Sequence, residues 1–228
     1  MPFYVYISWI YFCVVFGIAL ICSLIMSLLS TNFYTMHVVI RKFSMLDLEF
    51  PASPQELVTF IKGIFKLPGV ISKKSLKALK TQLYFHFLFI PFAYGSIFIA
   101  CMKVSSKMTY FGHGLFATLA WMQVIPLICD VVETIYLLKK IGPEPAISNQ
   151  TVHSAYVFLE VLKWVIALTA VICCFGAAFY FWLVGLYSDN SLHFLLIACA
   201  ELIIFFILKK LTKKSEKEMM EQIQVATA

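Results

Sequence analysis

Five stretches of this chain are apolar and long enough to cross a lipid bilayer, and no other feature constrains the fold as strongly. A helix needs about 20 predominantly apolar residues to span the hydrocarbon core. Charged residues make up only 13% of the 228 residues, against roughly 25% in a typical soluble domain. The sequence therefore predicts an all-α integral membrane bundle, a single domain over residues 1–228. Its transmembrane helices are expected at residues 3–29, 82–102, 110–138, 155–187 and 191–208.

Lysine and arginine are unevenly distributed over the segments between these spans. The loop 30–81 contains eight of them, the region from Lys139 into the fourth span contains three, and the tail 209–228 contains five. The two alternate connections contain two and none. Basic segments tend to remain on the cytoplasmic side of a membrane. We therefore expect the N-terminus outside, with the loop 30–81 and the tail in the cytoplasm.

The loop 30–81 is expected to carry structure of its own. Ser53 and Glu56 match a capping box, and Pro54 stands at the first helical position between them. An amphipathic helix follows, which would lie parallel to the membrane in the headgroup region or dock against the end of the bundle. Its apolar face is predicted to consist of Leu57, Phe60, Ile61, Ile64 and Phe65.

A second, basic helix is expected directly before the second span. It would begin near Ser72 and continue into the membrane without a break. Its lysines are interpreted as contacts to anionic lipid at the membrane surface. These lysines are Lys73, Lys74, Lys77 and Lys80.

Carboxylates interrupt the apolar third span. Asp130 and Glu133 lie three residues apart, and Gln123, two turns earlier, shares their broad face. A charged side chain in the hydrocarbon core costs about 2.5–3.5 kcal/mol on insertion scales, so such groups turn into the bundle and find partners. Counting along the helices places Asp130 and Glu201 each about 12 Å from the basic residues that mark one interface. We expect both to point into the bundle beside His86.

Four helices thus contribute to a predicted polar layer in the cytoplasmic half of the membrane. Its members are Gln82, His86, Gln123, Asp130, Glu133, Glu160, Lys163 and Glu201. The layer is either a set of interhelical hydrogen bonds and ion pairs, or a cavity for a polar ligand, a metal, a cation or a transferred proton. The sequence contains no HExxH or other dense ligand motif. No metal ligands, catalytic residues or cofactor are therefore assigned.

Part of the chain resembles a widespread group of uncharacterised bacterial multi-pass membrane proteins. The matching features are the run FSMLDLEF at residues 43–50, Ala52 after it, Tyr94 in the second span, and Asp130 and Glu133 as an acidic D-x-x-E pair ending the third. The resemblance covers about residues 43–138. It implies four or five helices in a bacterial inner membrane, and it implies no activity. A looser similarity to sterol isomerases of the emopamil-binding-protein type rests on acidic and histidine residues inside a small bundle.

Two of the acidic residues in that run lie one residue apart. In an extended segment the side chains of Asp47 and Glu49 would point the same way. They would then accept hydrogen bonds at a helix N-terminus, pair with lysines of the same loop, or lie in a solvated turn.

Three functions remain open. The first is a non-catalytic accessory bundle, or one that binds a lipid or small molecule, since no catalytic motif is found. The second is a membrane-embedded enzyme or isomerase that acts on a lipid through His86, Asp130, Glu133 and Glu201. The third is an ion-coupled transporter, for which five spans without an internal repeat are unusual. Membrane lipids, a membrane-protein partner or a second copy of the chain are the expected partners, and nothing points to nucleic acid.

Overall fold

The computed structural model describes residues 8–37, 39–187 and 189–227, most of them helical. Five helices in this part of the chain are long and apolar enough to cross a membrane, which confirms the number of predicted spans. They are α1 (Trp9–Ser30), α4 (Gly69–Ser105), the consecutive α5 (Tyr110–Met122) and α6 (Val124–Lys140), α7 (Gln150–Leu183), and the apolar part, Ser191–Thr212, of α8 (Asp189–Thr227). The first predicted span begins at residue 3, and residues 3–7 lie outside the described residues.

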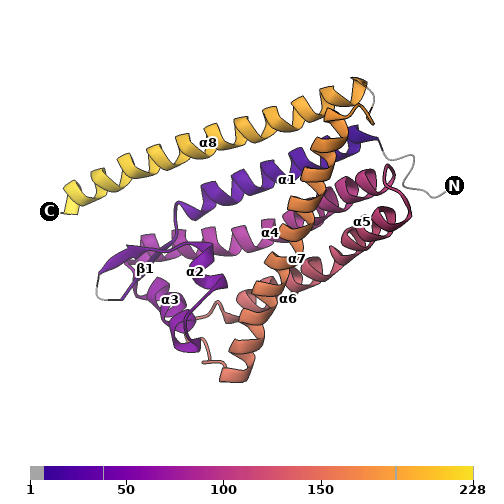
Figure 1. Cartoon of the computed structure of the whole chain (residues 1–228). Coiled ribbons are helices and arrows are strands. Elements are labelled where there is room, and N and C mark those ends of the chain that lie inside the picture. The colour runs from indigo at the N-terminus through magenta and orange to yellow at the C-terminus, as the bar shows by residue number, and fades with distance from the viewer. Residues whose placement is uncertain (1–7, 38, 188, 228) are drawn as a thin grey trace.

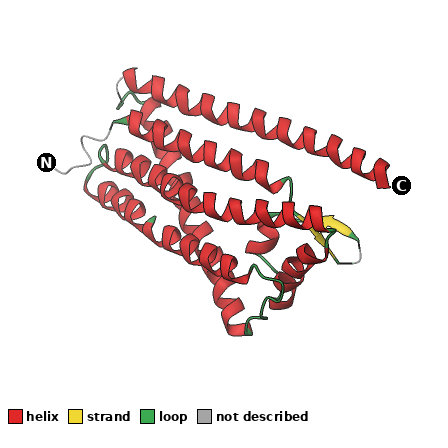
Figure 2. Ribbon diagram, turned by 180° about the vertical axis from the view of Figure 1, so that it is seen from behind, coloured by secondary structure: helices red, strands yellow, loops and turns green. Residues whose placement is uncertain are grey.

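The spans form an elongated bundle in which successive spans run in opposite directions (Figures 1 and 2). Helix α8 lies alongside α1, α4 packs on α1, and α7 crosses the bundle at a steep angle (Figure 1). One end of the bundle carries the loop between α1 and α4, together with the first turns of α4 and the last turns of α6. We refer to this end as the basic end.

The connection from α1 to α4 folds into two strands and two helices at the basic end. These are β1 (Tyr34–Met36), β2 (Ile40–Lys42), α2 (Met45–Glu49) and α3 (Pro54–Lys66). The strands pair antiparallel, with Thr35 opposite Arg41. The hairpin and α2 have no counterpart in the sequence-based prediction, whereas α3 is confirmed. Half of the predicted capping box is present, because the Ser53 hydroxyl oxygen accepts a hydrogen bond from the Glu56 N–H. The Glu56 carboxylate accepts from the Ala52 N–H rather than from Ser53.

The apolar face of α3 docks against the bundle. Four of its five predicted members are buried, and Phe65 packs at the edge of the same core. A glycine permits the close approach of α3 to β1, because a Cβ atom on Gly63 would lie 2.0 Å from Thr35 Oγ1. The core at this end includes Leu57, Phe60, Ile61 and Ile64 from α3, Leu79 and Leu83 from α4, and Leu137 from α6.

Helix α4 begins at Gly69, well before the predicted start of the second span at residue 82. Its 37 residues correspond to a length of about 55 Å, against about 30 Å for the hydrocarbon core of a bilayer. The basic helix and the second span are therefore one continuous helix, as the sequence predicted. Lys73, Lys74, Lys77 and Lys80 are all exposed on its first turns.

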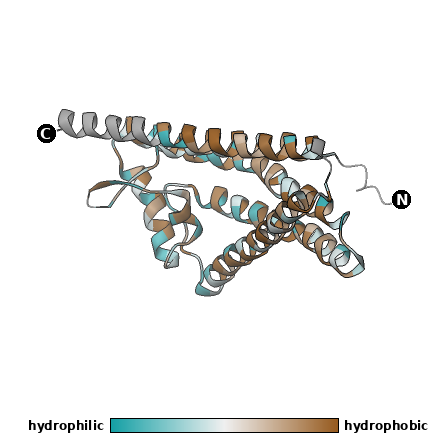
Figure 3. Cartoon of the chain, turned by 45° about the horizontal axis from the view of Figure 1, so that its top comes forward, coloured by the Kyte–Doolittle hydropathy of each residue, from teal (hydrophilic) through white to brown (hydrophobic). Residues whose placement is uncertain are grey.

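The opposite end of the bundle has a separate apolar core rich in aromatic residues. The Trp9 ring lies 5.0 Å from the Trp182 ring and 5.5 Å from the Tyr187 ring, between centroids. Apolar residues dominate the spans, while polar residues gather at the loops and helix ends (Figure 3).

Candidate functional site

A buried ammonium group lies among three carboxylates inside the bundle. Lys163 Nζ lies 2.6 Å from Asp130 Oδ1 and 2.7 Å from Glu160 Oε2, and it donates a hydrogen bond to Glu133 Oε2. None of these four side chains is more than 5% exposed. We refer to these four residues as the ion cluster.

The ion cluster is built from two pairs of residues at i, i+3 spacing, one pair on α6 and one on α7. Residues at this spacing share a helix face, so packing α6 on α7 brings all four side chains together. Helix α6 starts at a break after Gln123, the residue that joins α5 to α6. Pro126 follows in the first turn of α6. The N–H groups of a first turn have no acceptor within their own helix, so α6 tolerates a proline there.

Helix α4 supplies two further polar groups to Asp130. The Tyr94 hydroxyl donates to Asp130 Oδ2 at 2.6 Å, and His86 Nε2 lies 3.8 Å from the same oxygen. Tyr94 is buried, whereas the His86 side chain keeps 13% of its surface exposed. Asp130 therefore links α4 to the ion cluster through one oxygen and contacts Lys163 through the other.

Helix α2 covers the basic-end side of the ion cluster. The Tyr156 hydroxyl, on α7, donates to the Leu48 carbonyl oxygen at 3.0 Å. Glu49 is buried, and its Oε2 atom has no hydrogen-bond partner. Its charge interacts with those of Glu133 and Lys163. Burial, helped by the nearby Glu133 carboxylate, raises the pKa of Glu49 to about 7, although the Lys163 ammonium opposes the rise.

The predicted parallel orientation of Asp47 and Glu49 is wrong, because the segment is helical rather than extended. Asp47 Oδ2 accepts a hydrogen bond from the Ser44 N–H at 2.7 Å and completes a capping box at the start of α2. Asp47 is exposed and Glu49 is buried. Capping of a helix N-terminus thus holds for Asp47 alone, and Glu49 is neither solvated nor paired with a loop lysine through its Oε2 atom.

The ion cluster holds three carboxylates and one ammonium group. Burying an ion costs several kcal/mol unless partners repay it, and the excess negative charge here needs further neutralisation. The Tyr94 hydroxyl offsets part of it by donating a hydrogen bond to Asp130. In the described part of the chain, no group of three or more histidine, cysteine, aspartate or glutamate side chains is arranged to hold a metal ion. Lys163 itself supplies the cation between the carboxylates.

Of the eight residues in the predicted polar layer, the structure brings five together: His86, Asp130, Glu133, Glu160 and Lys163. The other three are placed differently. Gln82 is buried on α4 with its Oε1 atom unpaired, and Gln123 donates to the Leu119 carbonyl at the α5–α6 break. Glu201 packs against α1, because a Cβ atom on Gly17 would lie 2.9 Å from Glu201 Oε1.

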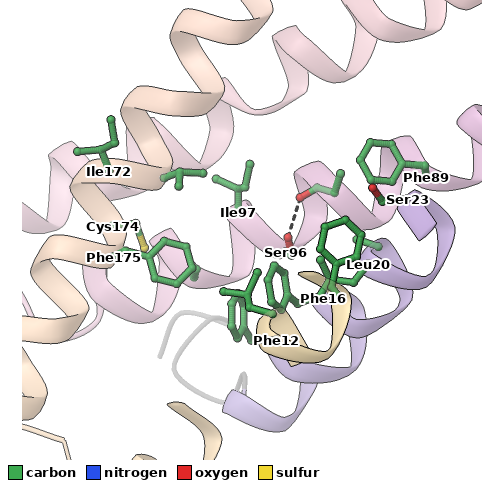
Figure 4. A pocket seen from close by; sticks show the side chains of 16 residues that line it. Phe12, Phe16, Leu20, Ser23, Phe89, Ser96, Ile97, Ile172, Cys174 and Phe175 are labelled. Atoms are coloured by element: carbon green, nitrogen blue, oxygen red, sulfur yellow. Dashed lines mark hydrogen bonds between the residues drawn. The ribbon is translucent and has the colours of Figure 1, made fainter. Parts of the chain in front are cut away.

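A second candidate site is an open-sided apolar groove of about 660 Å³ between α1, α4, α7 and α8 (Figure 4). Phe16 and Leu20 project into it from α1, Ile97 from α4 and Phe175 from α7. The Ser96 hydroxyl, also in its wall, donates to the Ala93 carbonyl at 2.7 Å, as the dashed line shows. No sequence signal predicts this groove, because its residues resemble any others that face lipid.

The groove and the ion cluster approach each other along α4. Phe89 lines the groove, and its ring centroid lies 5.7 Å from that of His86. His86 in turn lies beside Asp130. One turn of α4 therefore separates the apolar wall from the polar residues.

Comparisons with family models, with curated proteins and with solved structures find no match to this chain.

Proposed function

We propose that this protein is a non-catalytic multi-pass membrane protein that binds a lipid-like molecule in the groove between α1, α4, α7 and α8. The observation that supports this proposal most strongly is the groove itself. Its volume of about 660 Å³ falls in the range of about 300–1,000 Å³ that is usual for small-molecule sites. Because its walls are apolar and belong to spans, a molecule with alkyl chains is the occupant that matches it.

The state of the ion cluster supports a non-catalytic function. A general acid or base must come within hydrogen-bond reach of its substrate, and the carboxylates here are buried and engaged with Lys163. Their role in the proposal is structural. They join α6 to α7, Asp130 joins them to α4, and α2 covers them.

The groove-filling variant Ala93→Phe tests the proposal. Ala93 lines the groove and is partly buried, so a phenyl ring there occupies space that an alkyl chain would take. We expect the purified variant to retain much less co-purified lipid, measured by native mass spectrometry after detergent extraction. Ala117→Phe is the matched control, since Ala117 is partly buried on α5 and does not line the groove. Equal lipid retention by the two variants would contradict the proposal.

The proposal includes an orientation, with the N-terminus outside and α2 and α3 in the cytoplasm of a bacterium. The distribution of basic residues and the resemblance over residues 43–138 support it. Val70 at the basic end is 83% exposed, and Tyr110, the first residue of α5 at the opposite end, is 97% exposed. In intact cells, a membrane-impermeant maleimide should label Tyr110→Cys and leave Val70→Cys unlabelled. Labelling of Val70→Cys alone would reverse the orientation.

A second candidate, a membrane-embedded enzyme acting on a lipid, is favoured by the position of His86 alone. His86 is partly exposed, contacts Phe89 of the groove wall and lies 3.8 Å from Asp130. A lipid in the groove would then be converted by a histidine–aspartate pair. His86→Gln distinguishes the two functions. If the variant retains as much lipid as the wild type but the bound lipid differs in composition, the enzyme is favoured. If both the amount and the composition of the bound lipid are unchanged, the binding protein is favoured.

A further inference from the structure

The contact between α1 and α8 is bordered by three cavities that succeed one another along the two helices. The first, at the basic end, measures about 360 Å³ and is lined by Ser27 and Ser30 of α1 and Thr212 of α8, among others. The second measures about 180 Å³ and includes Leu24 of α1 and Leu208 of α8, one turn deeper. The third is the apolar groove, which shares Leu20 and Phe205 with the second.

Most of the described residues that line the first cavity are polar, and three of its hydroxyl groups donate their protons within the protein. The Ser30 hydroxyl donates to the Ser27 carbonyl, and the Thr212 hydroxyl donates to the Leu208 carbonyl. The Ser44 hydroxyl donates to Asp47 Oδ2. A hydroxyl has a single proton to donate, so the Ser30 and Thr212 oxygens are left as acceptors, whereas the Ser44 oxygen already accepts the Asp47 N–H. The Asp47 carboxylate adds a further acceptor at the same cavity.

Lys42 of β2 is the one cationic residue among the described residues that line the cavity. A phosphate group would bind at Lys42, and a primary ammonium group would bind at Asp47 and the hydroxyl oxygens. The described lining of this cavity therefore presents one cation and one carboxylate, a pattern that complements a zwitterionic headgroup better than a purely anionic one.

The apolar cavities have the length of a lipid tail. From Leu24 to Phe12, the α1 residues that line the second and third cavities extend over about 18 Å of helix. Half of a typical hydrocarbon core is about 15 Å. Glu201 of α8 lines the second cavity, where its carboxyl group packs onto the α1 backbone at Gly17 and its Oε2 atom is buried.

We propose that the α1–α8 seam binds one glycerophospholipid with a primary-amine headgroup, whose phosphate contacts Lys42, whose ammonium contacts Asp47, and whose tail enters the apolar groove. This inference rests on the proposed function and adds to it the class of lipid. The charge pairing at the basic end and the length of the apolar path favour a phospholipid over a transmembrane helix of a partner.

The test compares three lipids with identical dioleoyl chains on the delipidated full-length protein in detergent, by native mass spectrometry. They carry ethanolamine, choline or glycerol on the phosphate. Choline keeps the positive charge but has no N–H to donate, so it isolates the hydrogen bonds of the amine. We expect the ethanolamine lipid to bind about tenfold more tightly than the choline lipid, the equivalent of one charge-assisted hydrogen bond.

Variants at the headgroup cavity separate its two charges. Asp47→Asn should reduce the preference for the ethanolamine lipid over the choline lipid. Lys42→Gln should weaken the binding of all three lipids by a similar factor. Because Asp47 also caps α2, Thr212→Val provides a second variant that removes an acceptor oxygen without touching the cap. Thr59→Val and Lys62→Gln are the matched controls, since both residues are exposed on α3 and outside the cavity. Both should leave the preference unchanged.

The outcomes distinguish the inference from the function on which it rests. Equal binding of the ethanolamine and choline lipids, or tighter binding of the glycerol lipid, overturns the amine headgroup while leaving lipid binding in the groove intact. Binding of none of the three lipids, or a stable dimer in place of a lipid complex, overturns the proposed function itself. A preference for ethanolamine that survives both Asp47→Asn and Thr212→Val shows that the headgroup binds elsewhere and also overturns the inference.

Discussion

The ion cluster and the α1–α8 seam join helices by opposite means. In the ion cluster, α4, α6 and α7 are held by a lysine, three carboxylates and a tyrosine that are almost fully buried. Along the seam, apolar side chains predominate, and one weak hydrogen bond runs from Cys13 Sγ to the Phe194 carbonyl at 3.4 Å. In the most apolar part of α4, 39% of the residues are buried inside the fold, against 11% in the most apolar part of the last span.

This difference separates a fixed core from a replaceable contact. In a bilayer, apolar helices gain little by leaving lipid for each other, because lipid chains are equally apolar. A contact such as the seam can therefore exchange protein atoms for lipid atoms at small cost. An ion cluster cannot, because removing one member leaves the others unpaired in a medium that solvates charge poorly. The ligand binding that we propose thus belongs to the seam, and structural integrity belongs to the ion cluster.

The largest expected effect is the loss of the central cation. Lys163→Met leaves three carboxylates buried together and should destabilise the protein by about 3–5 kcal/mol, the usual cost of breaking a buried ion pair. We expect most of the detergent-extracted variant to aggregate, measured by size-exclusion chromatography after graded heating. Lys77→Met, at an exposed lysine of α4, should behave like the wild type. The seam counterpart Glu201→Gln should also remain folded.

The same substitution allows a rescue experiment. Adding Asp130→Asn, Glu133→Gln and Glu160→Gln to Lys163→Met removes the repulsion while keeping the shapes of the side chains, so much of the lost folded protein should return. Should the quadruple variant aggregate as severely as Lys163→Met, unpaired charge is not the cause, and the contrast between the two regions loses its basis.

The second expected effect concerns the pH dependence of α2 docking. Burial raises the pKa of Glu49 from 4.5 to about 7, so docked α2 holds a proton that the undocked segment has already released. Docking is therefore strongest below about pH 4.5 and weakens as pH rises to about 7, by at most about 3 kcal/mol at 1.36 kcal/mol per pKa unit. Above that range the cost is constant.

Hydrogen exchange of the α2 amides measures this dependence. Each measurement is compared with Glu49→Gln at the same pH, which cancels the chemical pH dependence of exchange. Relative to that variant, the wild type should lose protection between pH 5 and pH 7. A constant ratio across this range would show that Glu49 does not change its protonation state on docking.

The third expected effect tests the packing that holds the loop at the basic end. A Cβ atom on Gly63 would lie 2.0 Å from Thr35 Oγ1 and 2.9 Å from the Met36 carbonyl oxygen. Gly63→Ala should therefore cost about 1–3 kcal/mol through overpacking. Gly69→Ala is the control, because its Cβ atom would meet nothing within 4 Å. Thermal unfolding followed by circular dichroism should show a lower midpoint for Gly63→Ala only, and equal midpoints would mean that β1 can move aside.

Part of the fold could be predicted because its signals are local. The apolar runs determine the number of spans, and the cap at Ser53 together with the helical spacing of Leu57, Ile61 and Ile64 determines α3. The i, i+3 pairs on two helices, counted in depth from the basic residues, were enough to group Asp130 with Lys163. These features depend on spacing along one helix at a time.

The remainder depends on how helices rotate and dock, which spacing does not determine. Counting residues along the fifth span gave an expected depth for Glu201 but did not show that its side chain faces Gly17 of α1. Glu49 is buried because α2 docks under Tyr156, a long-range contact with no sequence signature. The groove could not be predicted either, because a phenylalanine such as Phe16 looks the same in the sequence whether it borders a cavity or lipid.

The smallest expected effect separates the docking of α2 from the integrity of the ion cluster. Tyr156→Phe removes the hydroxyl that donates to the Leu48 carbonyl oxygen and should cost about 1 kcal/mol, the usual net value of one hydrogen bond. Because the ring remains, its contact with Tyr136, 5.0 Å away between centroids, is kept. Hydrogen exchange should therefore increase about fivefold in α2, since 1.4 kcal/mol corresponds to a factor of ten, and should stay unchanged in α6. Tyr180→Phe, at an exposed tyrosine near the other end of α7, is the control. Increased exchange in both α2 and α6 would mean that α2 and the ion cluster unfold as one unit, so that the fixed core of the molecule extends to its basic end.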